Sequence, residues 1–380
     1  MTSKNILKEW LLGHPSNLPR ISLLDGGVST WLESQGATFA HRSLWSSSLL
    51  LTDPARIQQG HKDWLKDGGV NLISTVTYQC HYEPTLWPPG DVIRDEAHMD
   101  ELWRQAVGLA QGAVHECTTR DDDNNNDDNH RYRGIVASSG CYGAALANGA
   151  EYTGDYGDHI TVADLRRFHA RKLQIMTNLD AVDAIAIETI PSLEECYALR
   201  DLFTTTTTTT TMSKDDATTL NDNNNYNNKA CWISLSCRNG YELNDGTKVV
   251  DALRVLDDIP IDMVQAFGFN CCHADHLLSL IRILIEHYQR SPSASRRRAI
   301  VLYPNSGEAW NAVRQDWEPG SQCDATADHL MKCVREIERA FMDAGETENC
   351  RIIVGGCCRT TPNVLAALRK QVDEHSQKKT

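Results

Sequence analysis

Eight short apolar segments, each followed by a stretch with helical character, predict an α/β protein built as a (β/α)8 TIM barrel. Strands that alternate with helices form a parallel sheet with right-handed crossovers, and eight strands close such a barrel. At 380 residues, the chain suits a single barrel domain over residues 1–380 with low-complexity insertions. A doubly wound open sheet is the alternative, but no Gly-x-Gly-x-x-Gly follows the first predicted strand.

Local signals place the individual elements. Asp53-Pro54 is typical of an N-cap followed by proline at the first helical position, and Gly68-Gly69 ends that helix. Strands are expected at residues 21–24, 71–78, 134–138, 184–188, 231–236, 263–267, 299–303 and 351–354, where β-branched and apolar residues gather. Helices are expected at residues 54–66, 92–111, 162–179, from 191 onward, 249–256, 275–288, 327–344 and 362–375.

Three polar stretches interrupt this alternation, at residues 121–130, 204–229 and 290–298. The first is an Asp/Asn tract, the second joins a threonine run to an asparagine-rich run, and the third is rich in Ser and Arg. None has apolar periodicity, so none can bury enough surface to offset its ordering entropy. We expect disordered insertions in surface loops, where added length costs little.

Composition limits the classes of partner. The net charge of −14 argues against a nucleic-acid partner, and the one basic cluster, Arg296-Arg297-Arg298, lies in a Ser-rich loop. No apolar run reaches the roughly 18–20 residues that span a bilayer, and residues 1–20 do not resemble a secretory signal. Thirteen cysteines without the spacing of a disulfide framework indicate a reducing cytoplasm. A homo-oligomer is compatible with the sequence.

The active site of such a barrel forms at the carboxyl ends of the strands. Nearly every unusual polar cluster of this chain is expected at those ends. In order, they carry Asp25-Gly26-Gly27, residues 75–78, residues 138–140, Glu188-Thr189, Ser236, Asn270-Cys271, residues 303–307 and residues 355–358. This coincidence carries more weight than any single motif.

Two of these ends carry adjacent cysteines led by glycine, Gly268-Phe269-Asn270-Cys271-Cys272 and Gly355-Gly356-Cys357-Cys358. Three thiolates from these pairs would bind Zn2+ and leave one tetrahedral position open. Because three thiolates already neutralise the ion, a substrate thiol in that position would be deprotonated yet electron-rich, and therefore nucleophilic. The competing interpretations are plain buried cysteines, which behave as small hydrophobes, or a non-catalytic zinc-binding or redox-sensing protein.

Five segments resemble the homocysteine S-methyltransferase family, and the similarity runs from Leu23 to Ala367 apart from the insertions. They are Asp25-Gly26-Gly27, Glu188-Thr189-Ile190-Pro191, Gly268-Phe269-Asn270-Cys271, Tyr303-Pro304-Asn305-Ser306-Gly307-Glu308, and residues 355–362. Glu151-Tyr152-Thr153-Gly154-Asp155-Tyr156 and Leu44-Trp45-Ser46 also match. The resemblance implies a zinc-dependent enzyme that moves a methyl group from a sulfonium donor to the thiol of L-homocysteine, giving methionine.

The resemblance also implies roles for individual residues. Zinc would be held by Cys271, Cys357 and Cys358, with Cys272 outside the pattern. Asp25 and Glu188 would engage the amino group of homocysteine, as carboxylates favour an ammonium. Gly26 and Asn270 are expected among the other substrate-binding residues. Trp45 and Tyr78 match aromatic residues on the donor side, and aromatic faces attract sulfonium cations.

The motifs Glu188-Thr189-Ile190-Pro191 and Tyr303-Pro304-Asn305-Ser306-Gly307 resemble those of family members that use S-methylmethionine or S-adenosylmethionine as the donor. A betaine-homocysteine methyltransferase and a selenocysteine or other thiol methyltransferase remain alternatives. One position departs from the family: Cys141 stands where relatives commonly carry proline, which affects the expected stiffness of the loop beside the donor pocket.

Overall fold

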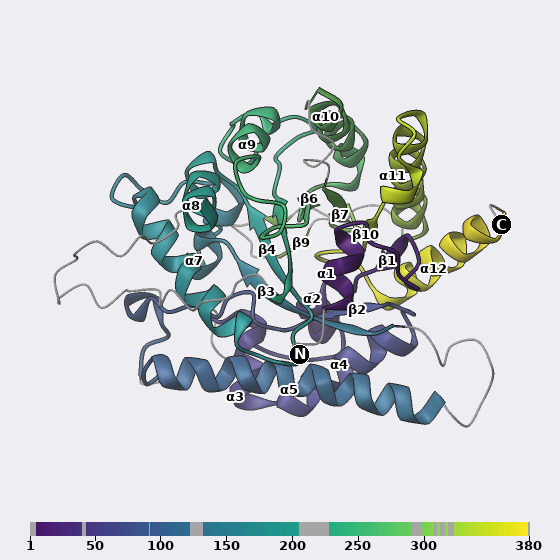
Figure 1. Cartoon of the computed structure of the whole chain (residues 1–380). Helices are drawn as coiled ribbons and strands as arrows, with labels where there is room; N and C mark the ends of the chain where they lie inside the picture. Colours follow the sequence, from purple (N-terminus) through teal and green to yellow (C-terminus); the bar gives the residue numbers. More distant parts are fainter. Residues whose placement is uncertain are drawn as a thin grey trace.

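A ring of eight parallel strands forms the centre of the molecule (Figure 1), in a computed structural model that describes residues 5–39, 43–90, 92–121, 132–204, 228–290, 298–307, 310–311, 316–317 and 323–378. Its strands are β1 (Ile21–Leu23), β2 (Leu72–Ser74), β3 (Gly134–Gly140), β4 (Ala184–Ile190), β5 (Ala230–Leu235), β6 (Ala266–Asn270), β7 (Ala299–Tyr303) and β10 (Ile352–Val354). They pair in the order β1-β10-β7-β6-β5-β4-β3-β2. The predicted (β/α)8 barrel is confirmed.

The first and second strands close the ring. Leu24 forms a parallel bridge with Leu72. The Asn71 N–H donates to the Leu23 carbonyl at 2.8 Å, and the Asp25 N–H donates to the Leu72 carbonyl at 3.0 Å. No edge of the ring is therefore left open between β1 and β2, and the carboxyl ends of all eight strands meet around one space.

Helices cover the outside of the ring (Figure 1). They are α2 (Val28–Ser34), α3 (Leu49–Thr52), α4 (Pro54–Lys66), α5 (Glu96–Asp121), α6 (Tyr142–Leu146), α7 (Val162–Thr177), α8 (Leu193–Thr204), α9 (Val249–Leu256), α10 (Leu277–Arg290), α11 (Cys323–Asp343) and α12 (Pro362–Gln377). A short antiparallel pair, β8 (Trp310–Asn311) and β9 (Asp316–Trp317), lies beside them. Among the described residues, no helix is both long and apolar enough to cross a membrane.

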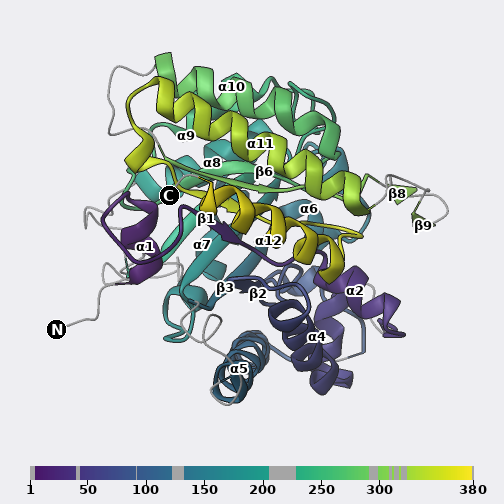
Figure 2. The ribbon, with the colours of Figure 1, turned by 90° about the vertical axis from the view of Figure 1, so that its right-hand side faces the viewer.

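A short helix, α1 (Ile6–Leu11), covers the amino-terminal end of the barrel. Figure 2 shows it at the opposite end from α2. Asn5 Nδ2 donates to the carbonyl of Asp183, just before β4, at 2.7 Å. Trp10 is fully buried and packs with the side chains that point into the barrel. Because this end is covered, the opposite end is the one available for ligands.

Side chains alternate between two cores. In β4, Ala184 and Ala186 belong to the cluster inside the barrel, whereas Ile185 and Ile187 belong to the cluster between the strands and the helices. Both cores are buried, so most strand residues are apolar on both faces, as expected of a parallel sheet covered on both sides. This explains why the strands are recognisable as continuous apolar runs.

Each predicted strand overlaps a strand of the structure, but several boundaries differ. For example, β2 ends at Ser74, not at residue 78, and α5 continues to Asp121, not to residue 111. The starts of β6 and α5 also differ. β6 begins at Ala266, not at residue 263, because Met263 and Val264 donate to the Pro260 carbonyl in a turn. α5 begins at Glu96, not at residue 92, because Asp95 accepts from the His98 N–H and caps the helix. Helices α1, α2, α3 and α6 were not predicted. The three expected insertions lie almost entirely outside the described residues.

Gly268 provides a test of the sheet. A Cβ at this position would lie 1.7 Å from the carbonyl oxygen of Val301, so Gly268→Ala must separate β6 from β7. We expect a loss of at least about 3 kcal/mol in the free energy of unfolding, measured by urea denaturation.

Gly108→Ala is the matched control. Gly108 lies on the exposed side of α5, and its Cβ would meet nothing within 4 Å. This substitution should stabilise the protein by about 0.5–1 kcal/mol, since alanine is the better helix former. Equal effects of the two substitutions would contradict the close approach of β6 and β7.

Candidate metal centre and substrate cavity

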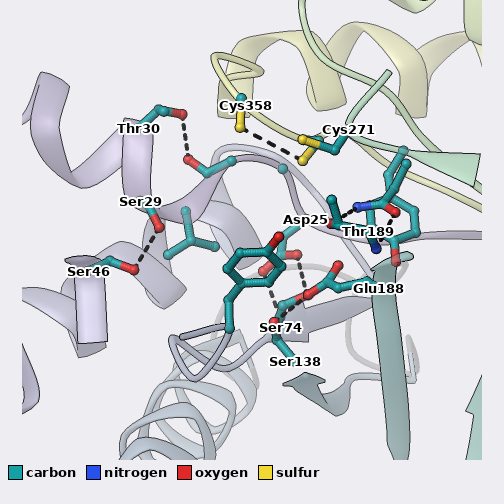
Figure 3. A pocket seen from close by; sticks show the side chains of 18 of the residues that line it. Asp25, Ser29, Thr30, Ser46, Ser74, Ser138, Glu188, Thr189, Cys271 and Cys358 are labelled. Carbon is teal, nitrogen blue, oxygen red and sulfur yellow. Dashed lines mark hydrogen bonds between the residues drawn. The ribbon is translucent and has the colours of Figure 1, made fainter. Parts of the chain in front are cut away.

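A cavity opens at the carboxyl ends of the strands, where the sequence places its polar clusters (Figure 3). Six of the predicted site residues line it together with the three predicted metal ligands. They are Asp25, Gly26, Trp45, Tyr78, Glu188 and Asn270, with Cys271, Cys357 and Cys358. Thus the fold brings together side chains from β1, β4, β6, β10 and the loops that follow them.

Three sulfur atoms form a cluster at one side of this cavity. The Sγ atoms of Cys271, Cys357 and Cys358 all lie within 4.8 Å of one another, and those of Cys357 and Cys358 are 4.0 Å apart. Hydrogen bonds from the other two thiols hold the pKa of Cys357 well below its usual range. Soft donors this close together can share one metal ion.

Backbone hydrogen bonds between neighbouring loops hold the cysteines in place. The Cys271 N–H donates to the Tyr303 carbonyl at 3.2 Å, which ties the end of β6 to β7. The Cys357 N–H donates to the Pro304 carbonyl at 2.7 Å, and the Ser306 N–H donates to the Cys358 carbonyl at 3.1 Å. The two cysteine-bearing loops therefore share the loop after β7 as a common support.

Glycines allow the first and last loops to touch. A Cβ at Gly27 would lie 2.6 Å from the Cys357 carbonyl oxygen, and one at Gly26 would lie 2.5 Å from the ring of Trp64. Larger residues would push the loop after β1 away from the cysteines. Gly26 lines the cavity, and its immediate role in the fold is to make room for Trp64.

Cys272 lies outside the cluster although it is adjacent to Cys271. It is 2% exposed and packs in the core between the strands and the helices. Of the other cysteines whose side chains the structure describes, Cys80, Cys117, Cys141, Cys196, Cys231, Cys237, Cys333 and Cys350 are buried. Cys141 precedes α6 and is not among the residues that line the cavity.

Asp25 and Glu188 face the same space across from the sulfur cluster (Figure 3). Asp25 is 1% exposed and accepts from the Ser74 N–H at 2.7 Å and the Ser74 hydroxyl at 2.8 Å. The Ser138 hydroxyl donates to Glu188 Oε1. Burial raises the pKa of Asp25 well above its usual value, and it raises that of Glu188 to about 7. A cation bound between them would restore their charged forms.

Asn270 acts on the backbone beside Glu188. Its Oδ1 accepts from the Thr189 N–H at 2.8 Å and from the Ser234 hydroxyl at 2.9 Å, and its Nδ2 donates to the Thr189 hydroxyl at 2.8 Å. Thr189 has φ of 64°, a conformation that a β-branched residue seldom adopts. Asn270 therefore fixes the strained turn that follows Glu188.

Positive φ angles are concentrated around the cavity. Among described residues other than glycine, φ is positive at Trp45 (40°), Ala147 (50°), Thr189 (64°), Cys271 (52°) and Arg359 (64°). Three of these line the cavity and a fourth, Arg359, directly follows Cys358. Backbone strain of this kind persists where the surrounding structure holds it, as it often does at functional sites.

Aromatic rings also line the cavity. Trp45 lies at the start of a 3-10 turn and contacts Phe39 edge-to-face, with 6.2 Å between ring centroids. Tyr78 packs against Gly140, where a Cβ would lie 2.8 Å from the ring. Tyr152 lines the cavity as well. The rings provide apolar and electron-rich surface next to the thiols and carboxylates.

Some residues of the cavity were missed as individuals by sequence reasoning. Ser74 and Ser138 donate hydrogen bonds to the carboxylates of Asp25 and Glu188. The sequence indicated them only by their positions near the ends of predicted strands. Glu151 and Tyr152 fall in a segment that resembles the family, but that resemblance assigned no role to them.

The barrel and its cluster of thiols define a class: (β/α)8 barrel enzymes with a candidate metal site built from cysteines. The sequence profile described as homocysteine S-methyltransferase matches residues 22–372. The chain belongs to this family.

Curated relatives agree over nearly the whole chain. Homocysteine S-methyltransferase of Escherichia coli (strain K12) is 31% identical over 352 residues, which cover 92% of this chain and 94% of the relative. Homocysteine S-methyltransferase 2 of Arabidopsis thaliana is 30% identical over 355 residues, with 92% of each chain covered. Selenocysteine Se-methyltransferase of Brassica oleracea var. italica is 30% identical over 353 residues, with 92% and 88% covered.

Solved structures of this family are similar to the chain over nearly its whole length. The homocysteine methyltransferase MmuM of Escherichia coli in its oxidised form has a TM-score of 0.67 at 28% identity, with 93% of this chain and 96% of that chain covered. Its metallated form has a TM-score of 0.65 with the same identity and coverage. A relative with this fold is thus known with bound metal, which supports a metal site here.

The three cysteines of the cluster can be tested against their neighbour. Cys271→Ala, Cys357→Ala or Cys358→Ala should each lower metal affinity by more than about 100-fold, since even changes outside the ligand set cost roughly 10–100-fold. The metal content of purified protein, measured by plasma mass spectrometry, gives the result.

Cys272→Ala is the control. It should keep the metal and lose about 1 kcal/mol in the free energy of unfolding, because a buried side chain is truncated. Full metal occupancy in any of the first three variants, or its loss in Cys272→Ala, would contradict the ligand assignment.

Proposed function

We propose that the chain transfers a methyl group from a sulfonium donor to the thiol of L-homocysteine and so forms methionine. The observation that carries this proposal is the placement of three thiols, one buried carboxylate and one half-buried carboxylate around one cavity. Homocysteine has a thiol at one end and an ammonium at the other, so it matches both groups. The thiol-rich site also suits a reducing cytoplasm.

We assign Zn2+ to Cys271, Cys357 and Cys358. Zn–S bonds of ~2.3 Å in a tetrahedron place sulfur atoms ~3.8 Å apart, which agrees with the 4.0 Å between Cys357 and Cys358 and the 4.8 Å limit for the set. When bound, the ion would keep the homocysteine thiol as a nucleophilic thiolate near neutral pH.

The chain's own residues orient the acceptor. Asp25 and Glu188 would bind the α-ammonium of homocysteine through charge-assisted hydrogen bonds. Ser74 and Ser138 already hold these carboxylates in place, so little ordering is needed when the substrate binds. The distance between this anchor and the cysteines fixes where the reacting sulfur lies.

The donor approaches from the aromatic side. The faces of Trp45 and Tyr78 attract the sulfonium, and their apolar surface excludes water from the reacting methyl group. The thiolate sulfur forms a bond to the methyl carbon while the bond from that carbon to the donor sulfur breaks. The donor sulfur keeps the electron pair and leaves as a neutral thioether, and the thiol proton has already passed to solvent.

Methionine formation from homocysteine tests this function. Purified zinc-loaded protein is incubated with homocysteine and, separately, S-methylmethionine, S-adenosylmethionine or betaine, and methionine is measured by mass spectrometry. We expect turnover with at least one sulfonium donor and none with betaine. A parallel reaction with selenocysteine as the acceptor tests the alternative that one relative's name suggests. Zinc binding without methionine from any donor would contradict the proposal.

Substitution of the carboxylates tests the acceptor site. Asp25→Asn and Glu188→Gln should each raise the KM for homocysteine about 10–100-fold, since a hydrogen bond to a charged group contributes roughly 1.5–3 kcal/mol. Glu194→Gln, on the exposed side of α8, is the matched control and should leave KM unchanged. An unchanged KM in both Asp25→Asn and Glu188→Gln would show that the ammonium binds elsewhere.

A further inference from the structure

A third carboxylate, Glu151, faces the cavity without a role in the reaction described so far. It belongs to a 3-10 turn, Ala150–Tyr152, in the loop after α6. We propose that Glu151 binds the α-ammonium of the methyl donor and thereby selects donors that carry an amino group. This inference rests on the proposed function and adds a specificity-determining residue to it.

In the part of the chain that the structure describes, the carboxylate of Glu151 accepts a backbone hydrogen bond only within its own residue, whereas the other two carboxylates accept from neighbouring serines. Asp25 and Glu188 accept hydrogen bonds from Ser74 and Ser138. Glu151 Oε2 is buried and has no hydrogen-bond partner among the described residues, although Glu151 lines the cavity. A buried acceptor without a partner costs about 1–3 kcal/mol, and more when it is charged. Such an atom at a cavity wall points to a ligand that donates to it.

The backbone of Glu151 is held firmly, so its orientation does not result from a loose loop. Asn244 Nδ2 donates to the Glu151 carbonyl at 2.7 Å and to the Ser236 hydroxyl at 2.9 Å, which links this turn to the end of β5. On the other side, a Cβ at Gly143 would lie 2.5 Å from the Glu151 nitrogen. Contacts from α6 and from the loop after β5 therefore hold the backbone from which the side chain extends.

Glu151 lies on the aromatic side of the cavity. Burial raises the pKa of Tyr78, and the nearby charges of Cys141 and Glu151 raise it further. Burial also raises the pKa of Tyr152, which lies near Cys271, Cys358 and Glu151. Glu151 is thus near the two tyrosines beside the thiols. Asp25 and Glu188, the residues proposed to bind the homocysteine ammonium, belong to the loop after β1 and to β4, respectively. Glu151 is therefore available to bind the donor.

The chemistry of the donor decides which of its charges Glu151 can bind. An unpartnered carboxylate oxygen needs an N–H or O–H donor. A sulfonium has neither, and its methyl group must face the acceptor thiol. The α-ammonium of S-methylmethionine or S-adenosylmethionine donates directly and neutralises the charge. No Lys or Arg occurs among the described residues that line the cavity. None of these lining residues can therefore neutralise the Glu151 carboxylate in place of the donor's ammonium.

The same argument predicts discrimination against donors without an amino group. Betaine and dimethylsulfonioacetate carry a cation and a carboxylate but no N–H. With either bound, Glu151 Oε2 would stay buried and unpaired. A site that must hydrogen-bond one group of its ligand rejects analogues without that group more strongly than an apolar pocket does.

The experiment compares Glu151→Gln with wild type, using S-methylmethionine and dimethylsulfonioacetate as donors at saturating homocysteine. Glutamine keeps the shape and removes the charge. We expect KM for S-methylmethionine to rise about 10–100-fold, whereas KM for dimethylsulfonioacetate stays the same or falls, because the unpaired charge is removed. KM for homocysteine, measured separately at saturating donor, should change less than about twofold. Where dimethylsulfonioacetate turns over too slowly, its inhibition constant against S-methylmethionine supplies the same comparison.

Two further variants complete the design. Glu151→Asp keeps the charge but shortens the side chain, and it should raise KM for S-methylmethionine less than Glu151→Gln does. Asp158→Asn, exposed in the same loop, is the matched control and should have no effect. Thermal unfolding establishes that all variants are folded.

Each outcome separates the inference from the function on which it rests. An equal loss with both donors, or a rise in KM for homocysteine, would overturn the role of Glu151 while methyl transfer stands. If wild type binds S-methylmethionine but forms methionine neither from it nor from S-adenosylmethionine, the proposed function fails. Calorimetric titration of Glu151→Gln with S-methylmethionine would then still test the assignment. Wild type that neither binds nor uses S-methylmethionine or S-adenosylmethionine would overturn both.

Discussion

The parallel pairing of β1 with β10 is the contact on which the rest of the site depends. It joins the first strand of the chain to the last, with Leu23 opposite Val354. Directly beyond this pair, the Gly356 N–H donates to the Asp25 carbonyl at 3.0 Å. The acidic loop after β1 and the cysteine loop after β10 therefore become neighbours. Any substitution that opens the ring here would separate the candidate ammonium anchor from two of the three thiols.

The cavity is acidic and poorly solvated, which determines what it can bind. Asp25, Glu151 and Glu188 all have pKa values raised by burial, because water no longer stabilises their charges. The described lining residues include no Lys or Arg to offset them. A metal ion at the cysteines, the ammonium of the acceptor and the cationic donor would each supply positive charge. Ligand binding and the protonation of the three carboxylates are consequently coupled. The substrates and the metal ion supply the positive charge that the lining residues do not.

Much of the fold and of the candidate site could be predicted from the sequence. Strands buried on both faces are continuous apolar runs, and the carboxyl ends of parallel strands must meet, so Cys271 and Cys357 could be placed together from 86 residues apart. The start of β6 could not be placed, because Met263 and Val264, at the end of the turn from Pro260, are apolar and resemble the start of a strand. Helix α2 was missed because its N-cap residue is Gly27, which provides no side-chain cap. Side-chain partners such as Ser74 for Asp25 depend on tertiary contacts, which no local pattern encodes.

The positive φ angles at Trp45, Thr189, Cys271 and Arg359 also bear on how this protein can change. Each left-handed residue other than glycine costs roughly 1–2 kcal/mol of fold stability. Selection for heat resistance would find accessible gains at these four positions, because glycine or asparagine would relax the backbone there. At Trp45 and Cys271 the same change would remove a ring or a thiol from the cavity. Thermal robustness and turnover therefore compete at a few residues around the cavity, while the rest of the barrel is free to become more stable.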